Sequence, residues 1–316
     1  MTSESTQSVA ISQKLHEAAC RGDGVLWIAL DAPNTNSAAF PDELLIAIEH
    51  PSSQIVPLLH PNIDPVWRPR WLRADTSTSA GSQLIQCSID HALRELNSDA
   101  LRNGQGRCIA GWLTSGSNDI SAVLKHVARQ MIRSHPAGGQ HLVRLHDPAV
   151  LWAAWPLLSA AQRKRLLGPI DNWTLLNPDG ELVTLAADGD EESSEWSREL
   201  WIDIENITPI NEMLRNTRGE ANPMSATRAH SIATAALRRA RLLGFTDFND
   251  LAVFARHAVE KHPHFDDHPI IKRALQARKA EDYYTALIES VSANEWHQVV
   301  ASAEASGSSQ HRHIVD

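Results

Sequence analysis

The order of hydrophobic and polar positions in the first part of the chain predicts strands that alternate with helices. Continuous apolar runs predict buried strands at Val25–Leu30, Arg107–Leu113 and His141–Leu145, and the turn signal Asn177-Pro178-Asp179-Gly180 predicts a hairpin around it. Apolar residues at helical spacing lie between these runs. The alternation is typical of an α/β layer architecture, and we expect a mixed sheet with flanking helices. The expected helices lie at about 11–20, 41–48, 82–96, 123–131, 149–158 and 159–167.

The segment between the first two of these strands is rich in proline. Prolines at 57, 61, 65 and 69 predict an edge strand over Ile55–Leu59 and then irregular structure from His60 to Trp71.

The pattern changes after the hairpin. Between Asp179 and Glu205 there are ten acidic residues and a single base, which predicts a solvated connector. From about residue 208 onwards the apolar positions follow helical spacing only, which predicts a small helical bundle. We therefore expect an α/β domain at 22–186, an acidic connector at 187–205, a bundle at 206–304 and a disordered tail at 305–316.

Length and charge agree with this division and narrow the classes of partner. The 316 residues are enough for about two domains. The 38 acidic and 29 basic residues leave a net charge of −9, which argues against nucleic acid or an anionic membrane as the main partner. The N-terminus lacks a secretory signal pattern, no apolar run is long enough to span a bilayer, and the three cysteines form no CxxC pair. We expect a protein of the reducing cytoplasm without a disulfide framework.

Tryptophan is the unusual feature of the composition. Ten of the seventeen aromatic residues are Trp, and seven of them, Trp67 included, precede the acidic stretch. Trp152 and Trp155 are three residues apart and share a helix face. Core packing is the ordinary interpretation of such a pair, and an anchor for a protein partner is the alternative. Together with Trp112 and Trp173 they are our candidate protein-binding residues.

The sequence contains no catalytic or cofactor-binding motif. A nucleophile elbow, a Walker A loop and a complete GxGxxG fingerprint are all missing. The cluster of histidines and aspartates from His257 to His268 has no established metal-ligand spacing, and Pro263 and Pro269 favour a helix exit followed by a helix start. We predict neither a cofactor nor a metal site. The alternative is a hydrolase that uses Ser115 with one of the sixteen histidines, such as His126.

One stretch carries a resemblance to a known family. It runs His141-Leu-Val-Arg144-Leu-His-Asp147-Pro148-Ala-Val-Leu151 and continues through Gln162 to Leu167-Gly168-Pro169-Ile170. This stretch resembles the signature of the type VI secretion effector adaptor family (Tap/TEC). Upstream, Gly111 to Ser115, the helix with Leu124-Lys125-His126, and the strand that ends at Asp31 look like further elements of that family. The chain has His126-Val127-Ala128-Arg129 where the family usually has His-Leu-Arg.

The resemblance implies a two-lobe cytoplasmic chaperone that catalyses no reaction. It implies two protein partners, a secreted effector and the VgrG spike of the secretion apparatus, onto which the effector is loaded. Arg144, Asp147, Pro148, Gly168 and Pro169 are the signature residues, and we expect them to be structural. An Asp before Pro148 is also a natural helix N-cap, so an Arg144–Asp147 pair is expected to support the architecture.

Overall fold

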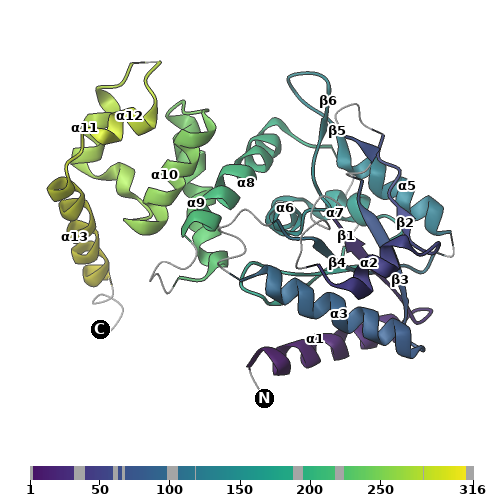
Figure 1. The fold of residues 1–316 in the computed structure, drawn as a ribbon. Helices are drawn as coiled ribbons and strands as arrows, with labels where there is room; N and C mark the ends of the chain where they lie inside the picture. Colours follow the sequence, from purple (N-terminus) through teal and green to yellow (C-terminus); the bar gives the residue numbers. More distant parts are fainter. Residues whose placement is uncertain are drawn as a thin grey trace. The chain divides into compact units, whose positions relative to one another are not determined.

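The computed structural model of the chain describes residues 3–31, 40–59, 63–65, 68–97, 106–117, 119–187, 195–217, 224–279 and 281–310. The chain divides into two compact units, Met1–Trp201 and Ile202–Asp316. Unit 1 contains a sheet with flanking helices, and unit 2 is helical (Figure 1). This confirms the predicted fold class. Trp67 and the central part of the expected connector, 188–194, lie outside the described residues.

Unit 1 is built on a six-stranded sheet of order β2-β3-β1-β4-β7-β8. All five strand pairs in this sheet are antiparallel, where a mixed sheet was expected. A second, two-stranded sheet pairs β5 with β6. The strands are β1 Val25–Leu30, β2 Gln54–Ile55, β3 Arg70–Asp75, β4 Ile109–Thr114, β5 Ile132–Ser134, β6 Gln140–Leu142, β7 Asn172–Leu176 and β8 Leu182–Leu185.

Strand β1 and the β7–β8 hairpin confirm the sequence predictions, and β3 corrects one. Residues 70 and 71 were expected to be irregular, yet Arg70–Asp75 pairs with β1 along all six residues. The local sequence Arg-Trp-Leu-Arg-Ala-Asp has no clean alternation, so cross-strand pairing decides its conformation. Similarly, the expected strand His141–Leu145 is reduced to Gln140–Leu142, because its partner is the short β5 rather than the main sheet.

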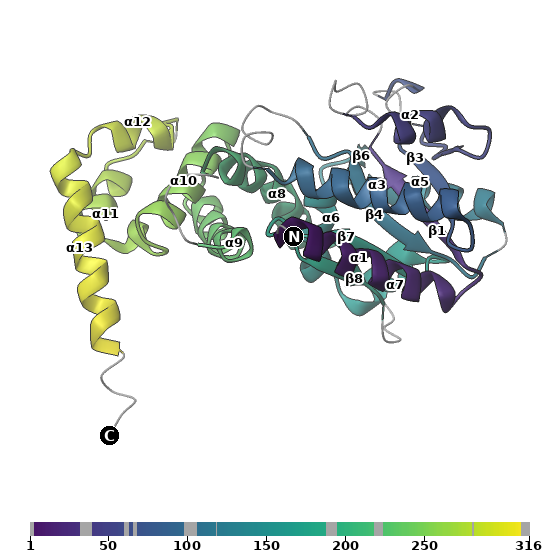
Figure 2. The ribbon, with the colours of Figure 1, turned by 60° about the horizontal axis from the view of Figure 1, so that its bottom comes forward.

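Three helices form one buried cluster of unit 1 with alternate residues of β1. Leu26, Ile28 and Leu30 of β1 belong to one buried cluster with side chains from α1, α2 and α3. Helices α1 and α3 lie side by side in both views (Figures 1 and 2). Helix α6 packs against β4 and β7, and α5 packs against α7. The helices of unit 1 are α1 Ser3–Cys20, α2 Asp42–Glu49, α3 Ser79–Glu95, α5 Ile120–Met131, α6 Pro148–Ala154 and α7 Ala160–Leu167, with the 3₁₀ turn η3 Trp155–Leu157.

Trp112 and Trp173 are core residues, which corrects their assignment to a binding surface. Their side chains are 1% and 2% exposed. The Trp112 indole donates to the Ser88 hydroxyl at 2.9 Å, and the Trp173 indole donates to the Ala110 carbonyl at 3.3 Å. The second contact needs Gly111, whose φ is +137° and at which a Cβ would lie 2.8 Å from the Trp173 indole nitrogen. Of the four candidate tryptophans, Trp152 and Trp155 alone retain partial exposure.

Unit 2 is entirely helical over its described residues. Its core gathers apolar side chains from every α-helix of the unit, with Phe254, Phe265 and Tyr284 at the centre of an aromatic cluster. Ring centroids in this cluster are 4.8 to 6.4 Å apart, the range in which aromatic pairs attract. The elements are α8 Arg198–Thr217, which begins in unit 1, α9 Ala226–Leu242, α10 Phe248–Glu260, η4 Phe265–Asp267, α11 Pro269–Gln276, α12 Tyr284–Glu289 and α13 Ala293–Gln310.

The element boundaries differ from the expected domain boundaries at three places. Helix α1 precedes the expected start at 22 and packs on α3 and β1. Helix α8 begins at Arg198, inside the expected connector at 187–205. Helix α13 continues to Gln310, so the expected disordered tail at 305–316 overlaps its last turns, and residues 311–316 lie outside the described residues.

Gly111→Ala tests the close approach of β4 and β7. A Cβ at Gly111 would lie 2.4 Å from the Thr174 carbonyl oxygen, in addition to the strain of a positive φ. We expect the free energy of unfolding to fall by about 3 kcal/mol, measured by urea denaturation. Gly138→Ala is the matched control, because Gly138 has a φ of +98° but no heavy atom within 4 Å of its Cβ position. Equal losses in the two variants would show that the contact with β7 contributes nothing.

Candidate functional site

The signature residues gather around Asp31, which follows the last residue of β1. The Arg144 guanidinium donates to Asp31 Oδ2 at 2.6 Å, and His146 Nε2 lies 3.6 Å from Oδ1. Asp147 Oδ2 lies 3.8 Å from the same Arg144 nitrogen, Nη2, that donates to Asp31. We call these four residues the Asp31 cluster. The structure therefore brings together the end of the first strand and a signature more than a hundred residues later.

The local sequence explains why this turn presents Arg144 and His146 on one side. Leu145 N–H donates to the Val143 carbonyl at 2.7 Å, and Asp147 N–H donates to the Arg144 carbonyl at 2.9 Å, which closes two tight turns. The Asp147 carboxylate then accepts from Ala149 N–H at 2.9 Å as the N-cap of α6, and the buried Pro148 occupies the first helical position. The predicted N-cap is confirmed, and Asp31 is the closer ion-pair partner of Arg144.

Burial controls the protonation of the Asp31 cluster. The Asp31 side chain is 1% exposed, and this desolvation raises its pKa to about 6 against the opposing effect of Arg144. Burial and the neighbouring Arg144 lower the pKa of His146 to about 3, so this imidazole is neutral at pH 7. The cluster thus holds a buried carboxylate, Asp31, against a half-exposed arginine, with the more exposed Asp147 carboxylate farther from that arginine and a neutral histidine beside Asp31. Its geometry is that of a structural ion pair at the edge of the core.

The second group of signature residues ties α7 to the loop after β4. The Ser115 hydroxyl donates to the Pro169 carbonyl at 2.7 Å and accepts from Ser117 N–H at 3.2 Å. Gly168, with a φ of +55°, ends α7 so close to α5 that a Cβ would lie 2.3 Å from His126 Nε2. That nitrogen lies 3.1 Å from the Leu166 carbonyl and therefore donates to it. Gly168 and Pro169 are thus placed as packing residues.

This arrangement is unlike a serine hydrolase site. The Ser115 proton is directed at a backbone carbonyl, and among the described residues no hydrogen bond joins Ser115 to a histidine. A nucleophilic serine needs a base within hydrogen-bond reach of its hydroxyl.

The histidine and aspartate cluster of unit 2 also has structural partners. His257 Nδ1 lies 2.6 Å from the Tyr284 hydroxyl in the core, and Asp266 accepts two hydrogen bonds from Arg239 at 2.8 Å. His268 caps α11, as the predicted helix start requires. In the part of the chain that the structure describes, no three His, Cys, Asp or Glu side chains are placed to share a metal ion.

Trp152 and Trp155 remain the candidates for a binding surface. Both are half-buried on α6 and the following 3₁₀ turn. The Arg163 guanidinium carbon lies 5.5 Å from the centre of the Trp155 ring, and its Nε donates to the Trp155 carbonyl at 3.0 Å. Part of the Trp155 ring is therefore covered by a cation of α7.

Sequence reasoning missed a second aromatic group in unit 1. His135 and His141 of the β5–β6 hairpin stack with centroids 4.4 Å apart, and both contact Trp201 at the start of α8. Trp196 packs on Trp201 at 5.2 Å and lies under the Arg133 guanidinium at 5.0 Å. Trp196 and Trp201 stand out in the acidic stretch, but the sequence around them does not show that they pack against the β5–β6 hairpin.

Arg144→Ala tests the Asp31 cluster. It leaves a buried carboxylate without its cation, so we expect the free energy of unfolding at pH 7 to fall by about 1–3 kcal/mol. The range extends down to about 1 kcal/mol because Arg144 is half-exposed and solvent screens its charge. The folded-state pKa of Asp31 is raised, so the carboxyl becomes protonated as the pH falls through about 6 and the loss should be smaller at pH 5. Denaturation at both pH values measures this.

The double variant Asp31→Asn with Arg144→Ala is the control for the ion pair. It should lose less stability at pH 7 than Arg144→Ala alone, because no buried charge remains. A loss that is independent of pH and additive with Asp31→Asn would contradict the pairing.

Ser115→Ala tests whether Ser115 has a structural role or acts as a nucleophile. We expect it to cost about 1 kcal/mol of unfolding free energy through the lost Pro169 contact, and we expect the unmodified chain to resist labelling by a fluorophosphonate probe. Ser117→Ala, in the same exposed loop, is the control. Labelling that disappears in Ser115→Ala alone would establish a reactive serine instead.

Comparison with known proteins gives one finding. Residues 69–165 match the family model described as Domain of unknown function (DUF4123), a domain known in type VI secretion effector adaptor proteins. No curated protein and no solved structure matches the chain. The matched range runs from the residue before β3 into α7 and contains Arg144, Asp147 and Pro148, while Asp31 and Gly168 lie outside it. The signature turn that holds Asp31 thus belongs to a segment similar to a domain of secretion adaptors.

Proposed function

We propose that this protein is a type VI secretion adaptor chaperone of the cytoplasm, which binds a cognate effector and promotes its loading onto the VgrG spike. The observation that carries the proposal is the match of residues 69–165 to DUF4123, a domain known in such adaptors. The signature residues inside that range build a turn that is closed by two backbone hydrogen bonds and a helix N-cap, and a preorganised surface loses less entropy on binding.

The chemistry of the site favours binding over catalysis. Two side chains that could act on a substrate have internal partners: Asp31 Oδ2 accepts from Arg144, and the Ser115 hydroxyl donates to the Pro169 carbonyl. Titratable groups with shifted pKa values also occur in structural ion pairs, so the pKa of Asp31 alone is no argument for an enzyme. We therefore propose a function without a catalytic step.

No helix within the described residues has the length and apolar character needed to cross a membrane. The partners that we propose, on the ground of the family match, are proteins, and the proposal includes neither nucleic acid nor membrane binding.

Co-purification tests the proposal. The tagged full-length chain is mixed with the effector and the spike protein encoded beside its gene, each at micromolar concentration, and retained protein is quantified. We expect both to be retained and to bind in calorimetry with Kd values in the micromolar range or below, since interfaces of standard size reach such affinities. An effector and a spike from an unrelated secretion cluster are the controls. Retention of neither cognate protein would refute the adaptor function.

A further inference from the structure

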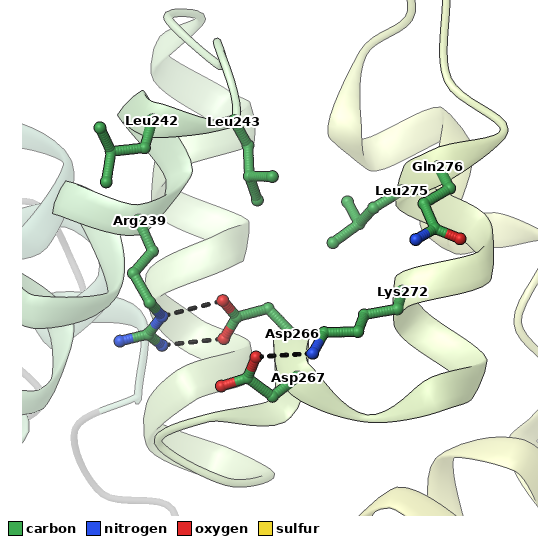
Figure 3. A pocket seen from close by; sticks show the side chains of 8 residues that line it. All are labelled: Arg239, Leu242, Leu243, Asp266, Asp267, Lys272, Leu275 and Gln276. Atoms are coloured by element: carbon green, nitrogen blue, oxygen red, sulfur yellow. Dashed lines mark hydrogen bonds and ion pairs between the residues drawn. The ribbon is translucent and has the colours of Figure 1, made fainter.

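Unit 2 contains a hollow between the end of α9 and α11 that the proposed function does not yet use. Its volume is about 360 Å³, and it is open to solvent on one side, where the Leu242 side chain is 88% exposed (Figure 3). Figure 3 shows Leu242 and Leu243 on one wall and Leu275 pointing towards them from the other. We call this hollow the Leu242 groove. It is lined by Arg239, Leu242, Leu243, Asp266, Asp267, Lys272, Leu275 and Gln276.

The floor of the Leu242 groove is polar but already paired. Arg239 donates two hydrogen bonds to Asp266, and Lys272 donates to Asp267 at 3.0 Å (Figure 3). These pairs hold η4 and α11 against α9 and leave the floor without net charge. A ligand therefore contacts mainly the apolar wall of the groove, and we expect that ligand to carry aliphatic side chains.

The wall is unusual for a protein surface because its leucines are adjacent and exposed. Leu242 is 88% and Leu243 is 39% exposed, at the last turn of α9. A single exposed leucine is ordinary, but three leucines around one hollow form a contiguous apolar patch. Such a patch gains free energy when a partner covers it.

The surroundings of the groove are positively charged although the chain is acidic. Helix α9 carries four arginines and no acid, and α11 carries Lys272 and Arg273 and no acid. Residues 224–279 contain ten basic and five acidic residues. Asp203 and Glu205 of α8 pair with Arg238 and Arg241 and reduce the surplus to three positive charges, in a chain of net charge −9. This region therefore attracts negative charge more than the rest of the chain does.

One cation next to the wall has no carboxylate partner among the described residues. The Arg278 guanidinium donates to the Leu243 carbonyl and stacks on Phe245, with its central carbon 4.4 Å from the ring centre. Both contacts fix its position beside Leu243, and no carboxylate of the described residues pairs with it. A ligand that fills the groove can place a carboxylate there, where a charge-assisted hydrogen bond to arginine is strong.

We propose that the Leu242 groove binds an acidic amphipathic segment of a protein partner, which inserts aliphatic side chains between Leu243 and Leu275 and directs carboxylates towards Arg278. This proposal rests on the adaptor function, which requires protein partners, and it assigns one partner-binding surface to unit 2. Laying the apolar stripe of a helix into such a groove is a recurrent mode of peptide recognition.

A synthetic peptide tests the chemistry without either natural partner. The probe is a labelled 16-residue amphipathic helix with leucines along one face and glutamates beside them, and the comparison peptide has lysine at every glutamate position. Fluorescence anisotropy with the full-length chain should show the glutamate peptide binding at least about tenfold more tightly, with an affinity that falls as salt is added. Equal binding of the two peptides, or binding of neither, would refute the proposed ligand chemistry.

Two variants locate the binding. Leu242→Glu removes part of the apolar wall and adds a repelling charge at an exposed position, and Lys272→Glu breaks the pair with Asp267 and makes the floor negative. Each variant should weaken binding of the glutamate peptide at least about tenfold. Ile46→Glu on α2 of unit 1, which replaces a residue that is 68% exposed, is the matched control and should change nothing. A stronger effect of Ile46→Glu than of Leu242→Glu would refute the assignment to this groove.

The same variants are then used with the effector and the spike protein. Loss of one of the two in Leu242→Glu, with the other retained, identifies the partner of the groove and shows that the variant is folded. If wild-type chain retains both partners and Leu242→Glu retains both unchanged, the groove proposal fails while the adaptor function stands. If wild-type chain retains neither, the adaptor function fails irrespective of the peptide result.

Discussion

The burial of the Asp31 carboxylate is the constraint on which much of unit 1 depends. Strand β1 lies in the middle of the six-stranded sheet, between β3 and β4, and its end carries a charged group into the core. A buried carboxylate is costly unless a cation and hydrogen bonds compensate it. Arg144 provides that compensation from the turn between β6 and α6, and Asp147 in the same turn begins α6. One ion pair thus joins the central strand to the helix that packs on β4 and β7.

The remaining signature residues serve the same architecture by a different means. Gly168 lets α7 end against His126 of α5, and the following Pro169 carbonyl receives the Ser115 hydroxyl from the loop after β4. These contacts are made by backbone groups and small side chains at close approach, so they leave little room for substitution or for a substrate. A segment of this kind suits a scaffold whose surface binds other proteins.

The two units solve the problem of buried polar groups in a similar way. In unit 2 the aromatic core encloses His257, whose pKa burial lowers to about 4, and its Nδ1 meets the Tyr284 hydroxyl. Asp250 accepts hydrogen bonds from Tyr284 N–H at 2.8 Å and from Thr285 N–H at 3.0 Å, which fixes the start of α12. These groups are satisfied internally, whereas Leu242 at the end of α9 is 88% exposed.

The sequence by itself determined the elements whose signal is local. Val25–Leu30 is a continuous apolar run, Asp147-Pro148 is a complete helix start, and the helices of unit 2 follow their apolar spacing and capping residues. Only the tertiary structure decided the rest. Strand β3 forms because β1 lies beside it, and Trp112 and Trp173 are buried because helix α3 covers one and Gly111 admits the other. Likewise, Asp31 meets Arg144 across 113 positions, and Leu243 and Leu275 line one groove although they are 32 positions apart. These contacts depend on how distant segments pack, and a local pattern of polarity carries no information about a partner so far along the chain.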